Sequence, residues 1–163
     1  MNIQWYISKG DVNSFARSIE AVIRNVGRGT KAATDQACRE ILEASLAQVP
    51  RDTGTLANTG FYEVIRRAAV KGYSYEGIIG YAGAVGSGFS RDAVNPKTGK
   101  AASSYAVIVH EDLTSAHLAG KAKFLEDPIR EYASRFPRVA ERHWSYALER
   151  SSAGGLSYIP TEV

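Results

Sequence analysis

The chain has 163 residues, of which 44% are hydrophobic and 23% are charged, and its formal net charge is +3. This length favours one domain, and the composition is ordinary for a globular protein with its own hydrophobic core. Because Cys38 is the only cysteine, an intramolecular disulfide is excluded, and a small buried side chain is expected there. The basic residues are spread along the chain without a long run of like charges. The charge therefore supports only a weak, general attraction to phosphate.

No segment has the pattern of a targeting or membrane-spanning sequence. Residues 1–5 are not a basic region followed by an apolar run, which is what a signal peptide requires. No stretch approaches the ~20 consecutive apolar residues that a membrane span needs. We therefore expect a soluble protein that is made in the cytoplasm and has no membrane partner.

The first 50 residues are predicted to form one strand and two helices. Apolar and other residues alternate over residues 3–7, and this period of two is typical of a strand. Apolar residues at helical spacing follow, and the sequence Gly27-Arg28-Gly29 is expected to break this first helix. A second helix is predicted from about residue 30 to residue 48, and Pro50 is expected to end it.

The second half of the chain is predicted to form a sheet and a long last helix. Alternation over residues 61–81, with a glycine turn in the middle, predicts an antiparallel hairpin. Residues 105–110 are the most apolar segment and are expected to be a central strand. The last helix is predicted to begin with Asp127 as its cap and Pro128 at its first position, with a kink or short break at Pro137.

These elements predict an α+β fold with a single domain over residues 1–150. In that fold, an antiparallel sheet of about four strands packs against two N-terminal helices and one long C-terminal helix. A long loop is expected at residues 83–104, and a C-terminal tail at residues 151–163. The tail is too short to bury its own apolar residues, so it is either disordered or laid against another subunit, and those residues favour the second.

The triplet Asp52-Thr53-Gly54 matches the catalytic sequence of aspartic proteases. That chemistry needs two such carboxylates that share one proton, and a single copy supplies both only in a homodimer. The enzymes place the triplet after an apolar strand, whereas here it follows Val49-Pro50-Arg51 at a helix exit. We therefore predict a structural turn, in which Asp52 is the cap and Gly54 adopts a backbone conformation that other residues resist.

A second group, His110, Glu111, Asp112 and His117, suggests a metal site. The zinc-protease helix requires two histidines four residues apart, whereas these two are seven apart. Glycines between residues 77 and 88 resemble a phosphate loop, but neither the dinucleotide nor the Walker pattern is present. We therefore expect no catalytic residue, no metal and no cofactor.

Three short motifs follow one another between about residues 30 and 148. The first reads Val49-Pro50-Arg51-Asp52-Thr53-Gly54-Thr55-Leu56, and the second reads Tyr105-Ala106-Val107-Ile108-Val109-His110-Glu111. The third reads Gly120-Lys121-Ala122-Lys123-Phe124-Leu125-Glu126-Asp127-Pro128 and precedes the last helix. Together and in this order, they resemble the tail-component family of tailed bacteriophages, which comprises small neck and tail-completion proteins.

The resemblance implies a non-enzymatic structural protein of the virion that is assembled in the cytoplasm of the bacterial host. Such proteins form closed rings around the path of the genome, commonly with six copies, and bind other neck and tail proteins. Non-specific contact with DNA in the channel is compatible with this role. The alternatives are a tail terminator, a nucleic-acid-binding accessory protein, and a hydrolase that uses Asp52 or the His110 group.

A ring requires two different patches on each subunit that meet each other. The loop at residues 83–104 is locally basic, and the tail carries apolar residues, so both are candidate partner contacts. His110 and Glu111 are expected to face a neighbour or the following loop. The candidate interface residues are therefore Arg91, Lys97, Lys100, His110, Glu111, Leu156, Tyr158 and Ile159.

Overall fold

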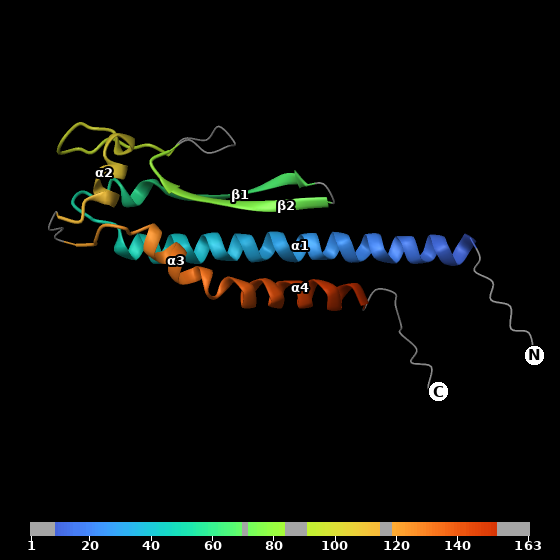
Figure 1. Ribbon diagram of the computed structural model, residues 1–163. Helices are drawn as coiled ribbons and strands as arrows, with labels where there is room; N and C mark the ends of the chain where they lie inside the picture. Colours follow the sequence, from blue (N-terminus) through green and yellow to red (C-terminus); the bar gives the residue numbers. More distant parts are fainter. Residues whose placement is uncertain (1–8, 70–71, 84–90, 115–118, 153–163) are drawn as a thin grey trace, which may run out of the picture.

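The computed structural model describes residues 9–69, 72–83, 91–114 and 119–152. A single helix, α1 (Lys9–Gln48), runs along the length of the molecule (Figure 1). Its 40 residues correspond to about 60 Å at the helical rise of about 1.5 Å per residue. No helix in these ranges is long and apolar enough to cross a membrane.

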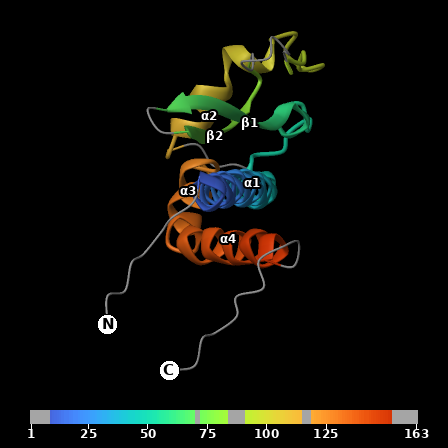
Figure 2. The same cartoon turned by 90° about the vertical axis from the view of Figure 1, so that its right-hand side faces the viewer.

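The molecule has three layers, and α1 is the middle one. A hairpin of β1 (Gly60–Ala69) and β2 (Gly72–Tyr81) lies on one side of the helix. Helices α3 (Glu126–Ala133) and α4 (Phe136–Ser152) lie on the other side. Figure 2, which views α1 along its axis, shows the three layers stacked with α1 in the middle.

The predicted sheet of about four strands is wrong. Within the described residues the sheet has two strands, paired antiparallel from Gly60 with Tyr81 to Ala69 with Gly72. The expected hairpin is therefore confirmed, but it stands without further strands in that part of the chain. The strand that we predicted at residues 3–7 lies outside the described residues.

The expected central strand at residues 105–110 is instead a short helix, α2 (Ala106–Glu111), which follows the 3-10 turn Ala102–Ser104. The Val109 N–H donates to the Tyr105 carbonyl at 3.0 Å, and the Asp112 N–H to the Ile108 carbonyl at 2.9 Å. A short apolar run fits a strand or a helix equally well by periodicity, and these local hydrogen bonds satisfy the backbone without a neighbouring strand.

The two predicted N-terminal helices are one continuous helix, so the expected break at Gly27-Arg28-Gly29 is also wrong. Gly29 is buried where α1 meets α4, and a Cβ atom there would lie 2.9 Å from the His143 carbonyl oxygen and 2.9 Å from Trp144 Cδ1. Next to it, the Trp144 indole N–H donates to Thr30 Oγ1 at 3.0 Å. Gly29 therefore allows close approach of two helices, and tertiary packing outweighs the low helix propensity of glycine.

The hairpin approaches α1 closely as well. A Cβ atom at Gly77 on β2 would overlap the Cys38 sulfur, and the Cys38 side chain is only 3% exposed. Tyr81, at the end of β2, shares a hydrogen bond of 2.8 Å with the buried Ser45 on α1. The expected buried position of Cys38 is thus confirmed, and it lies under the hairpin.

The main hydrophobic core lies at the C-terminal end of α1, where several segments converge. Phe124 is 2% exposed, and its ring packs edge-on against Tyr81 and His110, with ring centroids 5.2 Å and 5.0 Å apart respectively. The buried members of this core are Val49, Leu56, Ala82, Ala102 and Phe124. A smaller cluster of Ala37, Ile41 and Tyr132 joins α1 to α3.

The single long C-terminal helix that we predicted is two helices, with a break between Ala133 and Phe136. This confirms the break expected at Pro137, which cannot donate the N–H that a continuous helix needs. The expected cap is displaced, since α3 begins at Glu126 and Leu125 occupies the cap position. The helix α4 continues to Ser152, and residues 153–163 of the predicted tail lie outside the described residues.

The contact at Gly29 gives a matched pair of substitutions. Gly29→Ala should lower the free energy of unfolding by roughly 1–3 kcal/mol, the usual cost of overpacking, because α1 and α4 must move apart. Gly27→Ala should instead raise it by roughly 0.5–1 kcal/mol, since nothing lies within 4 Å and alanine is the better helix former. Urea unfolding of both variants measures the difference, and equal effects would contradict the role of Gly29.

Burial of Cys38 predicts a pH-dependent contribution to stability. Burial, with a smaller effect from the Asp35 charge, raises the pKa of the thiol from 9.0 to about 11. The protonated thiol is favoured by folding, so this contribution is complete below about pH 9 and is lost as the pH rises to about 11. Urea midpoints in that range should fall more steeply for the natural chain than for Cys38→Ala. Parallel curves would show that the thiol does not titrate with unfolding.

Candidate interaction surfaces

The N-terminal part of α1 carries a line of exposed apolar side chains. We call this line the α1 stripe, and 42–67% of each of its residues is exposed. Figure 1 shows that this end of α1 extends beyond the hairpin and α4. The spacing of three and four residues places the side chains on one face of the helix. The stripe consists of Val12, Phe15, Ile19, Val22 and Ile23.

The other faces of this helical segment are polar. Arg17 donates to the Asn13 carbonyl at 3.3 Å, and Arg24 forms an ion pair of 3.7 Å with Glu20 one turn before it. This segment is therefore amphipathic, although the described chain does not cover its apolar face. An amphipathic helix of this kind normally buries that face against another element, so the stripe is a candidate contact.

A second apolar surface lies at the other end of the molecule, where Figure 1 shows α2. Val107 and Ile108 project from α2, and Leu113 follows it, with 65–75% of each residue exposed. We call these three residues the α2 patch. The opposite side of the helix packs against the core, because Ala106 and Val109 contact it. The helix is thus anchored on one side and apolar on the side that faces solvent.

His110 and Glu111, which we expected to face a neighbour or the following loop, hold α2 in place. Nδ1 of His110 lies 2.8 Å from the Glu111 carboxylate, and its Nε2 accepts the Glu126 N–H at 3.4 Å. A neutral imidazole with its proton on Nδ1 makes both contacts. These side chains connect α2 to the start of α3 within one subunit.

Lys123 completes this network. It forms ion pairs with Glu111 and, at 3.1 Å, with Glu126. The hydrogen bond from Lys123, followed by that from His110, lowers the pKa of the Glu111 carboxyl. The hydrogen bond to Glu111 in turn raises the pKa of Lys123. The network is charged at neutral pH, and it joins the helix that carries the α2 patch to the start of α3.

The turn at residues 52–56 has the predicted backbone and a different cap. Gly54 has φ +75°, which confirms the expected conformation. The hydroxyl that caps the turn belongs to Thr53, whose Oγ1 accepts the Thr55 N–H at 3.4 Å and lies 2.7 Å from Thr55 Oγ1. Asp52 instead forms an ion pair with Lys97 of the following loop. The expectation that Asp52 caps the turn is therefore wrong.

The described part of the long loop is well bonded. Val94 and Ala101 form an antiparallel bridge, and the Asp92 carboxylate accepts the Ala93 N–H at 2.9 Å and the Ser103 N–H at 3.1 Å. These bonds, with the Ser103 hydroxyl foremost, lower the pKa of Asp92. Arg91 donates to the Gly60 carbonyl at 3.2 Å. The loop expected at residues 83–104 is therefore held by hydrogen bonds over residues 91–104, whereas residues 84–90 lie outside the described ranges.

The three sequence motifs meet at this end of the molecule. Val49 and Leu56 of the first motif and Phe124 of the third lie in the main core, and Tyr105 of the second packs against it. A hollow of about 330 Å³ separates the turn from the loop, and its lining includes Asp52, Gly54, Thr98, Lys100, Tyr105 and Val109. The three motifs thus pack against one another, and this packing fixes the positions of the turn and α2.

The residues that suggested a protease or a metal site can be located in part in the structure. No group of three or more His, Cys, Asp or Glu side chains among the described residues could hold a metal ion. The Asp52 carboxylate forms an ion pair with Lys97. His117 of the predicted metal group, and Leu156, Tyr158 and Ile159 of the predicted interface, lie outside the described residues.

The interface residues predicted from the sequence include neither the α1 stripe nor the α2 patch. The spacing of Phe15, Ile19 and Val22 was visible in the sequence, but the pattern alone indicates an apolar face and not what covers it. The α2 patch was hidden because Val107 and Ile108 were expected in a central strand. Of the basic residues predicted at the interface, Lys97 forms an ion pair with Asp52, and Arg91 donates to the Gly60 carbonyl of β1. Lys100 lines the hollow beside the turn.

The turn predicts a difference in stability between substitutions at Gly54 and at Asp52. Gly54→Val should lower the free energy of unfolding by about 1–2 kcal/mol or more, because a side chain strains a residue with φ +75°. Asp52→Asn should change it by less, since an exposed ion pair contributes little. Thermal unfolding of the two variants compares them, and equal stability would contradict the requirement for glycine.

The chain matches no known protein-family model. It also matches no curated protein and no solved structure. Its function must therefore be inferred from its own surfaces, above all from the α1 stripe and the α2 patch at opposite ends of the molecule.

Proposed function

We propose that the chain is a structural subunit of the head–tail neck of a tailed bacteriophage and assembles with copies of itself into a closed ring. In this proposal, the α1 stripe of one subunit packs against the α2 patch of the next. The observation that carries the proposal is the presence of two different exposed apolar surfaces at opposite ends of one elongated subunit.

A ring needs this arrangement because its contacts are heterologous: each subunit uses one surface toward the neighbour ahead and a different one toward the neighbour behind. A symmetric dimer would need only one self-complementary surface. Fully burying one large aliphatic or aromatic side chain stabilises by about 1.5–3 kcal/mol. The five residues of the stripe and the three of the patch therefore supply a favourable contribution that can exceed the entropic cost of association.

The virion role is supported by the resemblance of the three motifs to phage tail components. In the fold these motifs join the end of α1, α2 and the start of α3 around Phe124. They therefore support the α2 patch, which is the surface that the proposal assigns to a neighbouring subunit. As in that family, the expected assembly has six copies and binds further neck and tail proteins.

Two single variants test the head-to-tail contact. Phe15→Glu places a charge in the stripe, and Ile108→Glu places one in the patch. Each variant should fold, since both side chains are largely exposed, but each should remain a monomer while the natural chain forms rings. An equimolar mixture of the two variants should form dimers and go no further, because only one intact stripe and one intact patch can meet. Light scattering after size exclusion measures the masses, and electron microscopy shows the rings.

The matched control is Asn13→Glu. It adds the same charge to the same region of α1, but at about 100° per residue it lies well away from the stripe. This variant should assemble like the natural chain. If Ile108→Glu assembles normally while Phe15→Glu does not, the contact is stripe to stripe and the head-to-tail ring is wrong. A natural chain that stays monomeric at high concentration would also overturn the proposal.

A further inference from the structure

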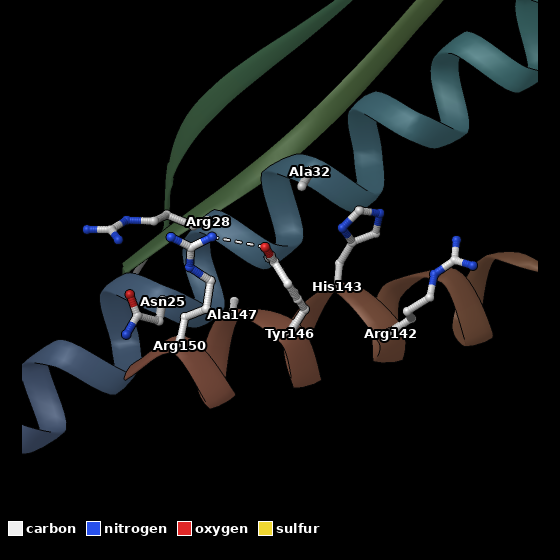
Figure 3. Close-up of a pocket in the computed structure, with 9 residues that line it drawn as sticks. Asn25, Arg28, Ala32, Arg142, His143, Tyr146, Ala147 and Arg150 are labelled. Carbon is white, nitrogen blue, oxygen red and sulfur yellow. Dashed lines mark hydrogen bonds between the residues drawn. The ribbon is translucent and has the colours of Figure 1, made fainter. Parts of the chain in front are cut away.

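A groove between α1 and α4 gathers basic side chains (Figure 3). It has a volume of about 880 Å³ and lies where the two helices run side by side. Arg28 comes from α1, and Arg142 and Arg150 come from α4. Figure 3 shows Arg150 reaching back over the groove toward Tyr146, with Arg142 further along the same helix. The remaining lining is Asn25, Gly29, Ala32, His143, Tyr146 and Ala147.

The charge of this groove is not neutralised within the described chain. Among those residues, no carboxylate lies within 4.0 Å of the guanidinium of Arg28, Arg142 or Arg150. The contacts of the latter two are with neutral groups: Arg142 donates to Gln36 Oε1 at 3.3 Å, and Arg150 to the Tyr146 hydroxyl at 2.9 Å. By contrast, Arg24, Arg67 and Arg130 all pair with glutamates.

Three uncompensated guanidinium groups around one groove create a positive potential that favours an anion. Guanidinium groups match phosphate well, because their fixed N–H donors bind two oxygens at once. Arg142 and Arg150 are two helical turns apart, which corresponds to about 12 Å along α4. The arginines are thus spread along the groove, and this spacing suits a ligand with several phosphates in a row.

We propose that this groove binds the phosphate backbone of a nucleic-acid strand. Tyr146 is largely exposed and lies between Arg142 and Arg150, so a sugar or base can contact its ring while phosphates occupy the arginines. The Nε2 of His143 is used within the chain, because it is hydrogen-bonded to Gln36 Oε1 at 2.7 Å. The inference goes beyond ring assembly and does not rest on it, because all the residues of the groove belong to one subunit.

The test is fluorescence anisotropy of a labelled single-stranded oligothymidylate with the full chain. The natural chain should bind it, with log affinity falling against log salt by about 0.7 for each phosphate neutralised. The triple variant Arg28→Gln, Arg142→Gln, Arg150→Gln should lose on the order of tenfold in affinity and show a shallower salt slope. Inorganic phosphate should compete poorly, because it occupies only one position.

The matched control carries Arg24→Gln, Arg67→Gln and Arg130→Gln, three arginines that are paired with glutamates. Both triple variants lower the formal net charge from +3 to 0, so they differ only in where the charge is lost. Equal loss of affinity in both would overturn the groove as the site.

Efficient competition by inorganic phosphate would overturn a strand as the ligand. Binding to phosphatidylglycerol vesicles without binding to the oligonucleotide would assign the groove to a lipid surface instead. The oligonucleotide should bind Phe15→Glu, which is expected to be a monomer, as tightly as it binds the natural chain. This result would show that the groove binds independently of ring assembly.

Discussion

The fold depends on the close approach of two elements to opposite sides of α1. On one side Gly29 lets α4 reach the backbone of α1, and on the other side Gly77 lets β2 lie directly over Cys38. Neither approach tolerates a side chain at these positions, because a Cβ atom would overlap the facing atoms. A hairpin of two strands is marginal in water by itself, so its packing along α1 is what makes it stable. The helix is therefore the common support for both outer layers.

This arrangement also explains why the two ends of the molecule differ. At the C-terminal end of α1, the turn, the loop, α2 and the start of α3 meet around Phe124 and form the main hydrophobic cluster. At the N-terminal end, the hairpin and α4 end before the helix does (Figure 1). The same helix thus has its apolar face covered at one end and open at the other. The α1 stripe follows from this asymmetry.

Two groups of polar side chains differ in whether their charges are paired within the chain. Lys123 forms ion pairs with Glu111 and Glu126, and the His110 imidazole is hydrogen-bonded to the Glu111 carboxylate and the Glu126 N–H, so this group holds α2 on α3. The arginines of the groove between α1 and α4 contact only neutral partners among the described residues. Charges that are paired within the chain are less available to a ligand, whereas a group of arginines without carboxylate partners attracts anions. The chain therefore combines apolar surfaces suited to its own copies with a polar groove suited to phosphate.

The sequence by itself determined the elements whose signals are local. These are the hairpin, the end of α1 before Pro50, the break before Pro137 and the positive φ of Gly54, each set by backbone sterics or strand alternation. It could not decide the role of Gly29, which resembles a helix breaker until α4 is seen against it. It also could not decide between strand and helix for residues 106–111, because a short apolar run fits both and only the surrounding packing selects one. The number of strands and the uncovered apolar surfaces are likewise tertiary properties. They depend on which distant segments meet, and local periodicity carries no information about that.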